Sequence, residues 1–246
     1  MKTMRKYNFI NRRCQRFTQK LEDRVTKGIF FDANGILYHR LEPLSRYVAD
    51  LMRLRGHAPE LTPEDAASLR QLEARASVGA VTAWDYWDER LRRHGVSDVE
   101  ERGDLTRQIL QQVHRVVPLP DVAEVLGVLK QRGFLLGVIS NTMYPLQWKK
   151  RWLQRAGVAS LIDIISSSTV VGAAKPDPAI YLDALTRARL EPSEAAFVGH
   201  EDVELAGARD VGMVTVAVSS DGGIPANYEV RQLTGLLTLP PFLRPQ

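Results

Sequence analysis

The sequence contains a single cysteine, Cys14, among its 246 residues, so an internal disulfide is excluded. It has no apolar run near the ~18 residues that a membrane-spanning helix needs, and no apolar stretch typical of a secretory signal. Internal repeats and low-complexity segments are also lacking. These absences favour a cytosolic protein without a membrane span.

Positive charge is concentrated at the N-terminal end. Residues 1–27 hold nine Lys/Arg against two acids, a net charge of +7, whereas the whole chain carries +4. The remainder is therefore mildly acidic, at about −3. The extension has two interpretations. In the functional one it contacts nucleic acid or an acidic membrane, or is a transit peptide. In the other it is a poorly ordered terminus without a function of its own. Because it contains no DNA-binding motif, a nucleic-acid partner is not expected.

Apolar runs followed by small or polar residues alternate with segments of helical periodicity. An apolar content of 44% is enough for a core of ordinary size. Strand, helix and strand in alternation indicate right-handed crossovers and a parallel sheet. The sequence therefore predicts an α/β fold with a doubly wound, five-stranded parallel sheet. The five expected strands are 28–31, 134–139, 162–165, 195–198 and 213–218.

Residues 39–118 interrupt this alternation with helix signals and no convincing strand. Thr62 and Pro63 are a typical helix start, and further helices are expected from 82 to 93 and from 104 to 115. An insertion after the first strand would lie over the carboxyl edge of the sheet as a helical cap.

The sequence thus predicts three parts: a basic extension (1–27), an α/β core (28–38 and 119–246) and a helical cap (39–118).

Three aromatic residues in the expected cap, Trp84, Tyr86 and Trp87, have two interpretations. They line a substrate pocket or, as is more common at helical spacing, form the core of the cap.

Polar residues directly follow several of the expected strands. These are Asp32, the pair Ser140 and Asn141, Lys175, and the acids after Gly199. The carboxyl ends of parallel strands meet at one edge of the sheet, where ligands bind in such folds. A carboxylate can act as a nucleophile, a hydroxyl and an amide can hold phosphoryl oxygens, and a lysine can offset the negative charge.

Four segments together resemble the motifs of the haloacid dehalogenase-like hydrolase superfamily. They are Phe31-Asp32-Ala33-Asn34-Gly35-Ile36-Leu37, Ile139-Ser140-Asn141, Lys175-Pro176-Asp177-Pro178 and the stretch from Phe197 to Met213. The resemblance covers residues 28–237 and implies the α/β core with a cap between the first two motifs. It also implies that Asp32 is the nucleophile, and that Ser140, Asn141 and Lys175 bind the phosphoryl group.

The first motif departs from the family pattern at Asn34, where phosphatases of the family have a second Asp as general acid and base. An amide has no titratable proton, so it cannot take that role, which contributes ~10²–10⁴-fold. Its backbone carbonyl still suits a metal ligand. Asn34 also has a purely structural interpretation, as the residue that supports a turn before Gly35.

The fourth motif departs at His200, where the family has a metal-binding Asp. The resemblance implies Mg²⁺ held by Asp32, Asn34, Glu201 and Asp202, in a site weakened because imidazole is a poor magnesium ligand. Alternatively, Glu201 and Asp202 are first-turn acids that complement a helix N-terminus.

Three functions follow as hypotheses. The first is hydrolysis of a small phosphorylated metabolite through an aspartyl-phosphate at Asp32. The second is metal-independent carbon–halogen hydrolysis, which fits Asn34 and His200. The third is a catalytically degenerate binding or regulatory protein. The sequence predicts neither the substrate nor the oligomeric state.

Overall fold

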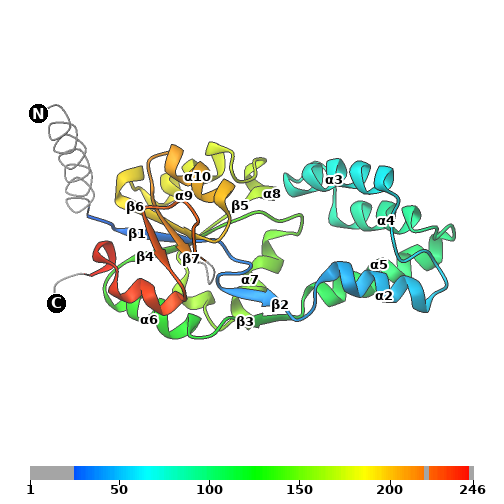
Figure 1. Cartoon of the computed structure of the whole chain (residues 1–246), viewed down its shortest axis with the longest axis horizontal. Helices are drawn as coiled ribbons and strands as arrows, with labels where there is room; N and C mark the ends of the chain where they lie inside the picture. Colours follow the sequence, from blue (N-terminus) through cyan, green and yellow to red (C-terminus); the bar gives the residue numbers. More distant parts are fainter. Residues whose placement is uncertain (1–24, 219–221, 244–246) are drawn as a thin grey trace, which may run out of the picture.

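The computed structural model describes residues 25–218 and 222–243. The expectations for the basic extension therefore fall mostly outside the described residues. The main sheet has six parallel strands: β1 (Gly28–Phe31), β4 (Leu135–Ser140), β5 (Ile164–Ser167), β6 (Ala195–Gly199), β7 (Val214–Val218) and β8 (Tyr228–Val230). Their order is β5-β4-β1-β6-β7-β8, which places β1 near the centre (Figure 1). The α/β class and the parallel sheet agree with the prediction.

The predicted number of five strands was wrong by one. The additional strand, β8, has three residues and pairs in parallel with the far side of β7, at the edge of the sheet. A short edge strand needs no long apolar run, so the sequence pattern did not reveal it. A second, two-stranded antiparallel sheet joins β2 (Tyr38–Arg40) to β3 (Val116–Pro118), where no strand was expected.

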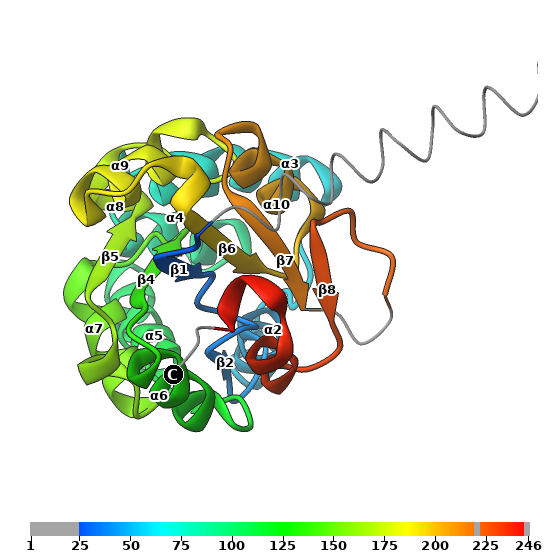
Figure 2. The same ribbon diagram turned by 90° about the vertical axis from the view of Figure 1, so that its left-hand side faces the viewer.

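Helices cover both faces of the main sheet (Figure 2). On one face lie α6 (Val122–Gln131) and α7 (Leu146–Arg155), and on the other lie α9 (Pro178–Ala188) and α10 (Asp202–Asp210). The shorter helices are α8 (Ser168–Val171), η1 (Ala159–Leu161), η2 (Pro192–Glu194), η3 (Leu233–Thr238) and η4 (Pro240–Phe242). None of the helices in the described ranges is long and apolar enough to cross a membrane.

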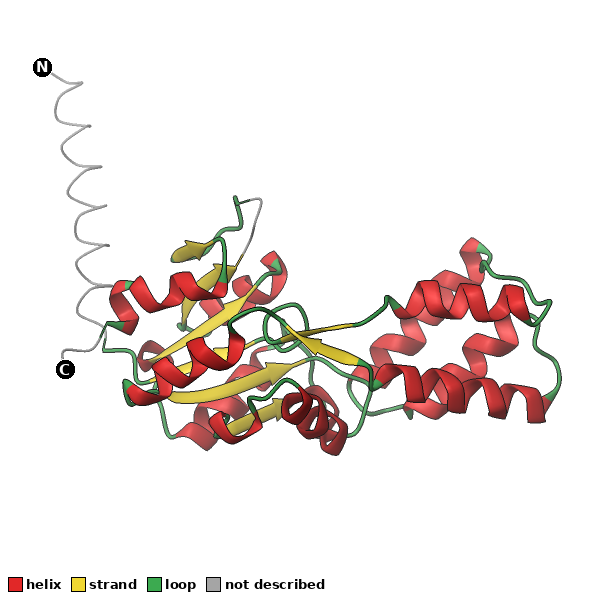
Figure 3. Cartoon of the chain, turned by 90° about the horizontal axis from the view of Figure 1, so that it is seen from below, coloured by secondary structure: helices red, strands yellow, loops and turns green. Residues whose placement is uncertain are grey.

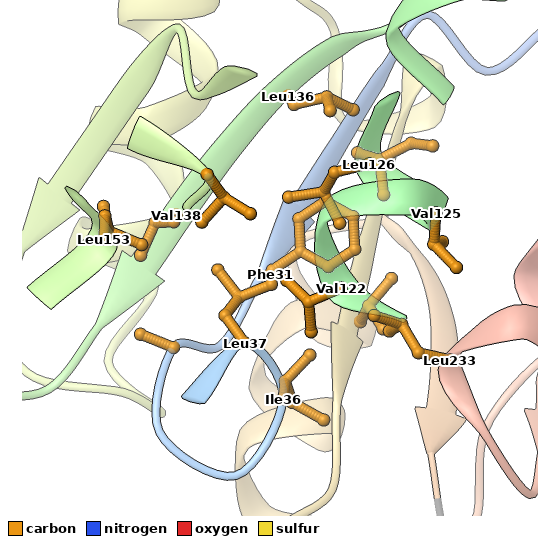
Figure 4. Packing of buried hydrophobic residues seen from close by; sticks show 14 of the residues in the cluster. Phe31, Ile36, Leu37, Val122, Val125, Leu126, Leu136, Val138, Leu153 and Leu233 are labelled. Carbon is orange, nitrogen blue, oxygen red and sulfur yellow. The ribbon is translucent and has the colours of Figure 1, made fainter. Parts of the chain in front are cut away.

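The central strand β1 is buried on both faces, which explains its continuous apolar run. Its side chains alternate between two hydrophobic clusters: Phe31 packs in one and Phe30 in the other. Figure 4 shows Phe31 among side chains of α6 and β4, including Leu126 and Leu136. This double burial fixes the position at which the strand ends, and therefore fixes the backbone of Asp32.

Four helices form a segment that extends beyond the carboxyl end of the main sheet (Figures 1 and 3). We call residues 44–113 the helical segment; it contains α2 (Leu44–Leu54), α3 (Pro63–Ser77), α4 (Ala83–Arg93) and α5 (Val99–Val113). A hydrophobic cluster of its own holds these helices together. Thr62 and Thr82 cap α3 and α4, each accepting a backbone N–H at 3.1 Å. The sequence analysis predicted α3 and α4 closely, placed the start of α5 five residues late, and missed α2.

The chain enters the helical segment through β2 and leaves it through β3. These two strands pair directly, with Tyr38 opposite Pro118 and Arg40 opposite Val116. The guanidinium of Arg40 also donates to the carbonyl of Val113 at 2.6 Å. The two chain connections between the main sheet and the helical segment therefore pair with each other as one two-stranded ribbon, which we call the β2–β3 ribbon.

Helix α10 lies very close to the loop that carries Lys175. A Cβ atom added at Gly207 would lie 2.7 Å from the carbonyl oxygen of Pro176 and 3.0 Å from its Cα. Such distances are too short for ordinary packing, so only glycine allows this approach. The contact sets the distance between the helix and the lysine loop.

We predict that Gly207→Ala lowers the free energy of unfolding by about 1–3 kcal/mol, because the added methyl group displaces backbone atoms. Gly127→Ala is the matched control: this helical glycine has nothing within 4 Å of a built Cβ, so alanine there should stabilise by about 0.5–1 kcal/mol. Urea denaturation measures both changes. Equal midpoints for Gly207→Ala and the wild type would contradict the close approach.

Candidate active site

Asp32 lies at the carboxyl end of β1, in the centre of the main sheet. Its backbone N–H donates to the carbonyl of Val198 at 2.9 Å, which continues the pairing of β1 with β6 beyond the strand. The side chain is largely buried. The carboxylate is therefore held at the end of a central strand of the sheet.

The ammonium group of Lys175 bridges two carboxylates. Its Nζ lies 2.6 Å from Oδ1 of Asp32 and 2.6 Å from Oε2 of Glu204, and its side chain has no exposed surface. Two acids thus share one cation in a buried position. Asp32 and Lys175, which the sequence placed at the same edge, do lie together.

Glu204 is an acid of the site to which the sequence analysis assigned no role. Its position as the second acid of the fourth motif was visible in the sequence, but nothing there showed contact with Lys175. Burial, which the Lys175 ammonium only partly offsets, raises the pKa of Glu204 to about 7, and the charge of Asp32 adds to the rise.

Asn141 binds the lysine loop with both ends of its amide. Its Oδ1 accepts the backbone N–H of Lys175 at 2.7 Å, and its Nδ2 donates to the Lys175 carbonyl at 3.1 Å. The expected substrate contact is thus already engaged in positioning Lys175. The neighbouring Ser140 is buried, and its hydroxyl makes only a long bond of 3.3 Å to the Asn141 carbonyl.

Asn34 lies in the tight turn that follows Asp32, and it is exposed. The turn closes through the N–H of Gly35, which donates to the carbonyl of Tyr38 at 2.7 Å. Gly35 has φ +87, and a Cβ there would lie 2.7 Å from the ring of His200. The turn therefore needs glycine both for its conformation and for the imidazole packed against it.

His200, rather than an acid, faces the free side of the nucleophile. Its Nδ1 lies 3.8 Å from Oδ2 of Asp32, and this buried nitrogen has no hydrogen-bond partner among the residues that the structure describes. Glu201 and Asp202 are exposed at the start of α10, with Oε1 of Glu201 3.9 Å from Nε2 of His200. In the described residues, no group of three or more His, Cys, Asp or Glu side chains is arranged to hold a metal ion.

A cavity of about 430 Å³ opens from the catalytic loops toward the helical segment. Asn34 and Asn141 line its inner end, and Tyr86 and Trp87 of α4 line its outer part. The two aromatic residues also belong to the core of the helical segment, so both earlier interpretations hold for them. Trp84 is 39% exposed and does not line the cavity.

Lys149 of α7 is a buried lysine that the sequence analysis did not single out. Its Nζ donates to the hydroxyl of Tyr38 at 2.9 Å and lies 5.1 Å from the ring centre of Trp152. Burial lowers the pKa of Lys149 to about 7; Asp32 opposes the change, and Arg40 and Lys175 add to it. A signal was present, since Lys149 stands three residues before Trp152 on the apolar face of α7.

Comparisons with known proteins show the family to which the chain belongs. A family model described as haloacid dehalogenase-like hydrolase matches residues 26–212. Glyceraldehyde 3-phosphate phosphatase of Methanopyrus kandleri is 36% identical over 203 residues, covering 79% of this chain and 84% of that protein. (S)-2-haloacid dehalogenase 1 of Pseudomonas sp. (strain CBS-3) is 32% identical over 88% of this chain and 96% of its own. Among solved structures, a HAD phosphatase from Thermococcus onnurineus has a TM-score of 0.60 and 26% identity, covering 86% of this chain and 96% of that one.

We predict that Lys149→Met changes how the free energy of unfolding depends on pH, because it removes a buried ammonium group. The pKa of Lys149 is lower in the folded protein than in the unfolded chain. Between pH 7 and the ordinary lysine pKa of about 10.5, the unfolded chain therefore binds more protons than the folded protein. Wild-type stability should therefore rise with pH in this window by about 1.4 kcal/mol per pH unit relative to the variant. At pH 7 the variant should be the more stable protein.

Denaturation with urea between pH 7.5 and 10 measures this difference. Lys150→Met, at the exposed neighbouring position of the same helix, is the control and should show no such slope. A difference between wild type and Lys149→Met that does not change with pH would show that Lys149 titrates normally in the fold.

Proposed function

Because the chain belongs to the haloacid dehalogenase-like hydrolases, we propose that it hydrolyses a small phosphorylated metabolite through an aspartyl-phosphate at Asp32. One observation carries the proposal: Lys175 holds Oδ1 of Asp32 at 2.6 Å, while Oδ2 accepts no hydrogen bond from the described part of the chain. One oxygen is thus fixed and neutralised, and the other is available for attack. The names of the phosphatase relatives support this reaction class.

The reaction has two steps. Oδ2 of Asp32 attacks phosphorus, the bond from phosphorus to the ester oxygen breaks, and the leaving oxygen takes a proton. Water then attacks the phosphorus of the aspartyl-phosphate, which releases phosphate and restores the carboxylate. Lys175 offsets charge in both steps, and the Ser140 hydroxyl, which has only a weak bond in the protein, binds a phosphoryl oxygen.

Proton transfer is the weak point of this site. Asn34 cannot donate a proton to the leaving group, so the proton comes from water. We therefore expect activity to depend strongly on the leaving group, with good leaving groups favoured.

Phosphatases of this family generally use Mg²⁺. The donors in this chain fit the ion poorly, because Oδ1 of Asp32 is bound to Lys175 and an imidazole faces Oδ2. When bound, Mg²⁺ would supply positive charge beside the phosphoryl oxygens, with Asp32, the Asn34 carbonyl, Glu201 and Asp202 as the proposed donors. We expect only a weak dependence on Mg²⁺ and assign it no step.

Carbon–halogen hydrolysis is a second candidate, favoured by the same two positions, Asn34 and His200. There Asp32 would attack carbon, displace halide and form an ester that water hydrolyses. This reaction needs neither an acid for the leaving group nor a metal. The third candidate, a binding protein without catalysis, predicts no product of either kind.

The first test is a panel of phosphate monoesters and 2-chloropropionate, with and without Mg²⁺. We expect phosphate release, and we expect Asp32→Asn to abolish it because an amide is not a nucleophile of comparable strength. Asp104→Asn, on the exposed surface of α5, is the control and should retain activity. Halide release instead of phosphate would favour the second candidate, and no product would favour the third.

The second test restores the missing acid. Asn34→Asp should raise turnover of alkyl phosphates by about tenfold or more, and raise that of p-nitrophenyl phosphate less, because nitrophenolate needs no proton. His200→Asp combined with it should exceed the product of the single effects and depend on Mg²⁺, since neighbouring sites couple. Equal gains for both ester types would contradict a missing general acid, and a dehalogenase would gain nothing from the new carboxylate.

A further inference from the structure

The cavity beside Asp32 is lined by more basic side chains than acidic ones, and the proposed reaction does not use them. Three basic side chains line it: Arg40 of β2, Arg90 of α4 and Lys149 of α7. One acid, Glu73 of α3, lines it with them. Within residues 25–218 and 222–243, none of the three cations takes part in an ion pair.

Each cation also has donor capacity left over. Lys149 is almost completely buried, and its ammonium, with three donors, makes one hydrogen bond to the described residues, to the Tyr38 hydroxyl. Arg90 donates from Nη1 to the Tyr86 hydroxyl at 3.1 Å, while its buried Nε has no hydrogen-bond partner in the described part of the chain. Buried donors without partners are costly, and an anion bound beside them would complete their hydrogen bonds and favour the charged form of Lys149.

The location of the cavity, between the nucleophile and the helical segment, indicates which part of a substrate would bind in it. Asn34 and Asn141, beside the nucleophile and the lysine loop, line its inner end. A phosphoryl group at Asp32 would therefore direct its leaving group into the cavity, toward Lys149 and Arg90. About 430 Å³ suits a small metabolite and is within the range of ligand pockets.

We propose that this cavity is an anion subsite, and that the preferred substrate is a small phosphate monoester whose leaving group carries a second anion, a carboxylate or a second phosphate. The inference rests on the proposed function for the placement of the phosphoryl group. Lys149 and Arg90 bind the second anion, and Arg40, held by the Val113 carbonyl, adds to the positive field. Aromatic rings flank these groups: Arg40 lies 5.2 Å from the ring centre of Trp152, and Arg90 lies 5.5 Å from that of Trp87. These apolar rings exclude water from one side of the guanidinium groups, which strengthens their attraction for an anion.

Matched substrates test the subsite. 3-Phosphoglycerate and glycerol 3-phosphate differ only in a carboxylate against a hydroxymethyl group, and fructose 1,6-bisphosphate differs from fructose 6-phosphate in a second phosphate. In at least one of these pairs, we expect kcat/KM to be about tenfold or more higher for the ester that carries the second anionic group. This is the effect of about one charge-assisted hydrogen bond. The pair that shows the preference identifies the second anion.

Lys149→Met and Arg90→Gln should each reduce that preference by on the order of tenfold. Lys150→Met is the control on the same helix and should keep it. No preference in either pair, or a preference retained in both cavity variants, would overturn the subsite.

Direct binding separates this inference from the proposed function. Calorimetry on Asp32→Asn, which should hold the ester without hydrolysing it, measures the affinity for 3-phosphoglycerate against glycerol 3-phosphate, and for the bisphosphate against fructose 6-phosphate. If no ester releases phosphate but a preference in affinity persists and Lys149→Met removes it, the proposed function fails and the anion subsite stands. If p-nitrophenyl phosphate is hydrolysed but the members of both pairs bind and react equally, the subsite fails and the function stands.

Discussion

The bridge from Asp32 through Lys175 to Glu204 is the interaction on which the site depends. One ammonium, without exposed surface, holds two carboxylates at 2.6 Å each. Removing the lysine would leave two buried acids facing each other, which is far more costly than losing a surface ion pair. The arrangement is also electrically incomplete, because two negative charges face one positive charge. Burial is the main reason that the pKa of Glu204 is raised to about 7, and the unbalanced charge of Asp32 adds to the rise.

The remaining contacts serve to keep this lysine in place. Asn141 binds both backbone groups of Lys175, and Gly207 lets α10 approach the following proline. Asn141 follows β4, Lys175 lies in the loop between α8 and α9, and Gly207 lies within α10, so these contacts unite segments that are distant in the sequence. The same contacts explain why the amide of Asn141, expected to touch substrate, is a positioning group in this structure.

The sequence was sufficient for the fold class and for the meeting of Asp32 with Lys175, because buried strands and the residues that follow them have a clear periodic signature. It was insufficient for β8 and for the β2–β3 ribbon, which are three-residue strands stabilised by pairing rather than by apolar runs. Within the site, Glu204 and Lys149 were not assigned. Their roles depend on which charges lie nearby after folding; the spacing of Lys149 from Trp152 indicates the apolar face of α7 but not the groups that Lys149 meets there.

The β2–β3 ribbon gives the molecule a property beyond the shape of its site. The cavity walls come from two bodies, since Lys149 belongs to the α/β core and Arg90 to the helical segment, and the chain joins these bodies only through that ribbon. A ligand that contacts both walls would therefore hold the two parts together. By thermodynamic linkage, any free energy needed to separate the parts becomes part of the ligand's affinity. Residues far from the nucleophile, such as those that pair in the ribbon, would then influence the rate at which product leaves.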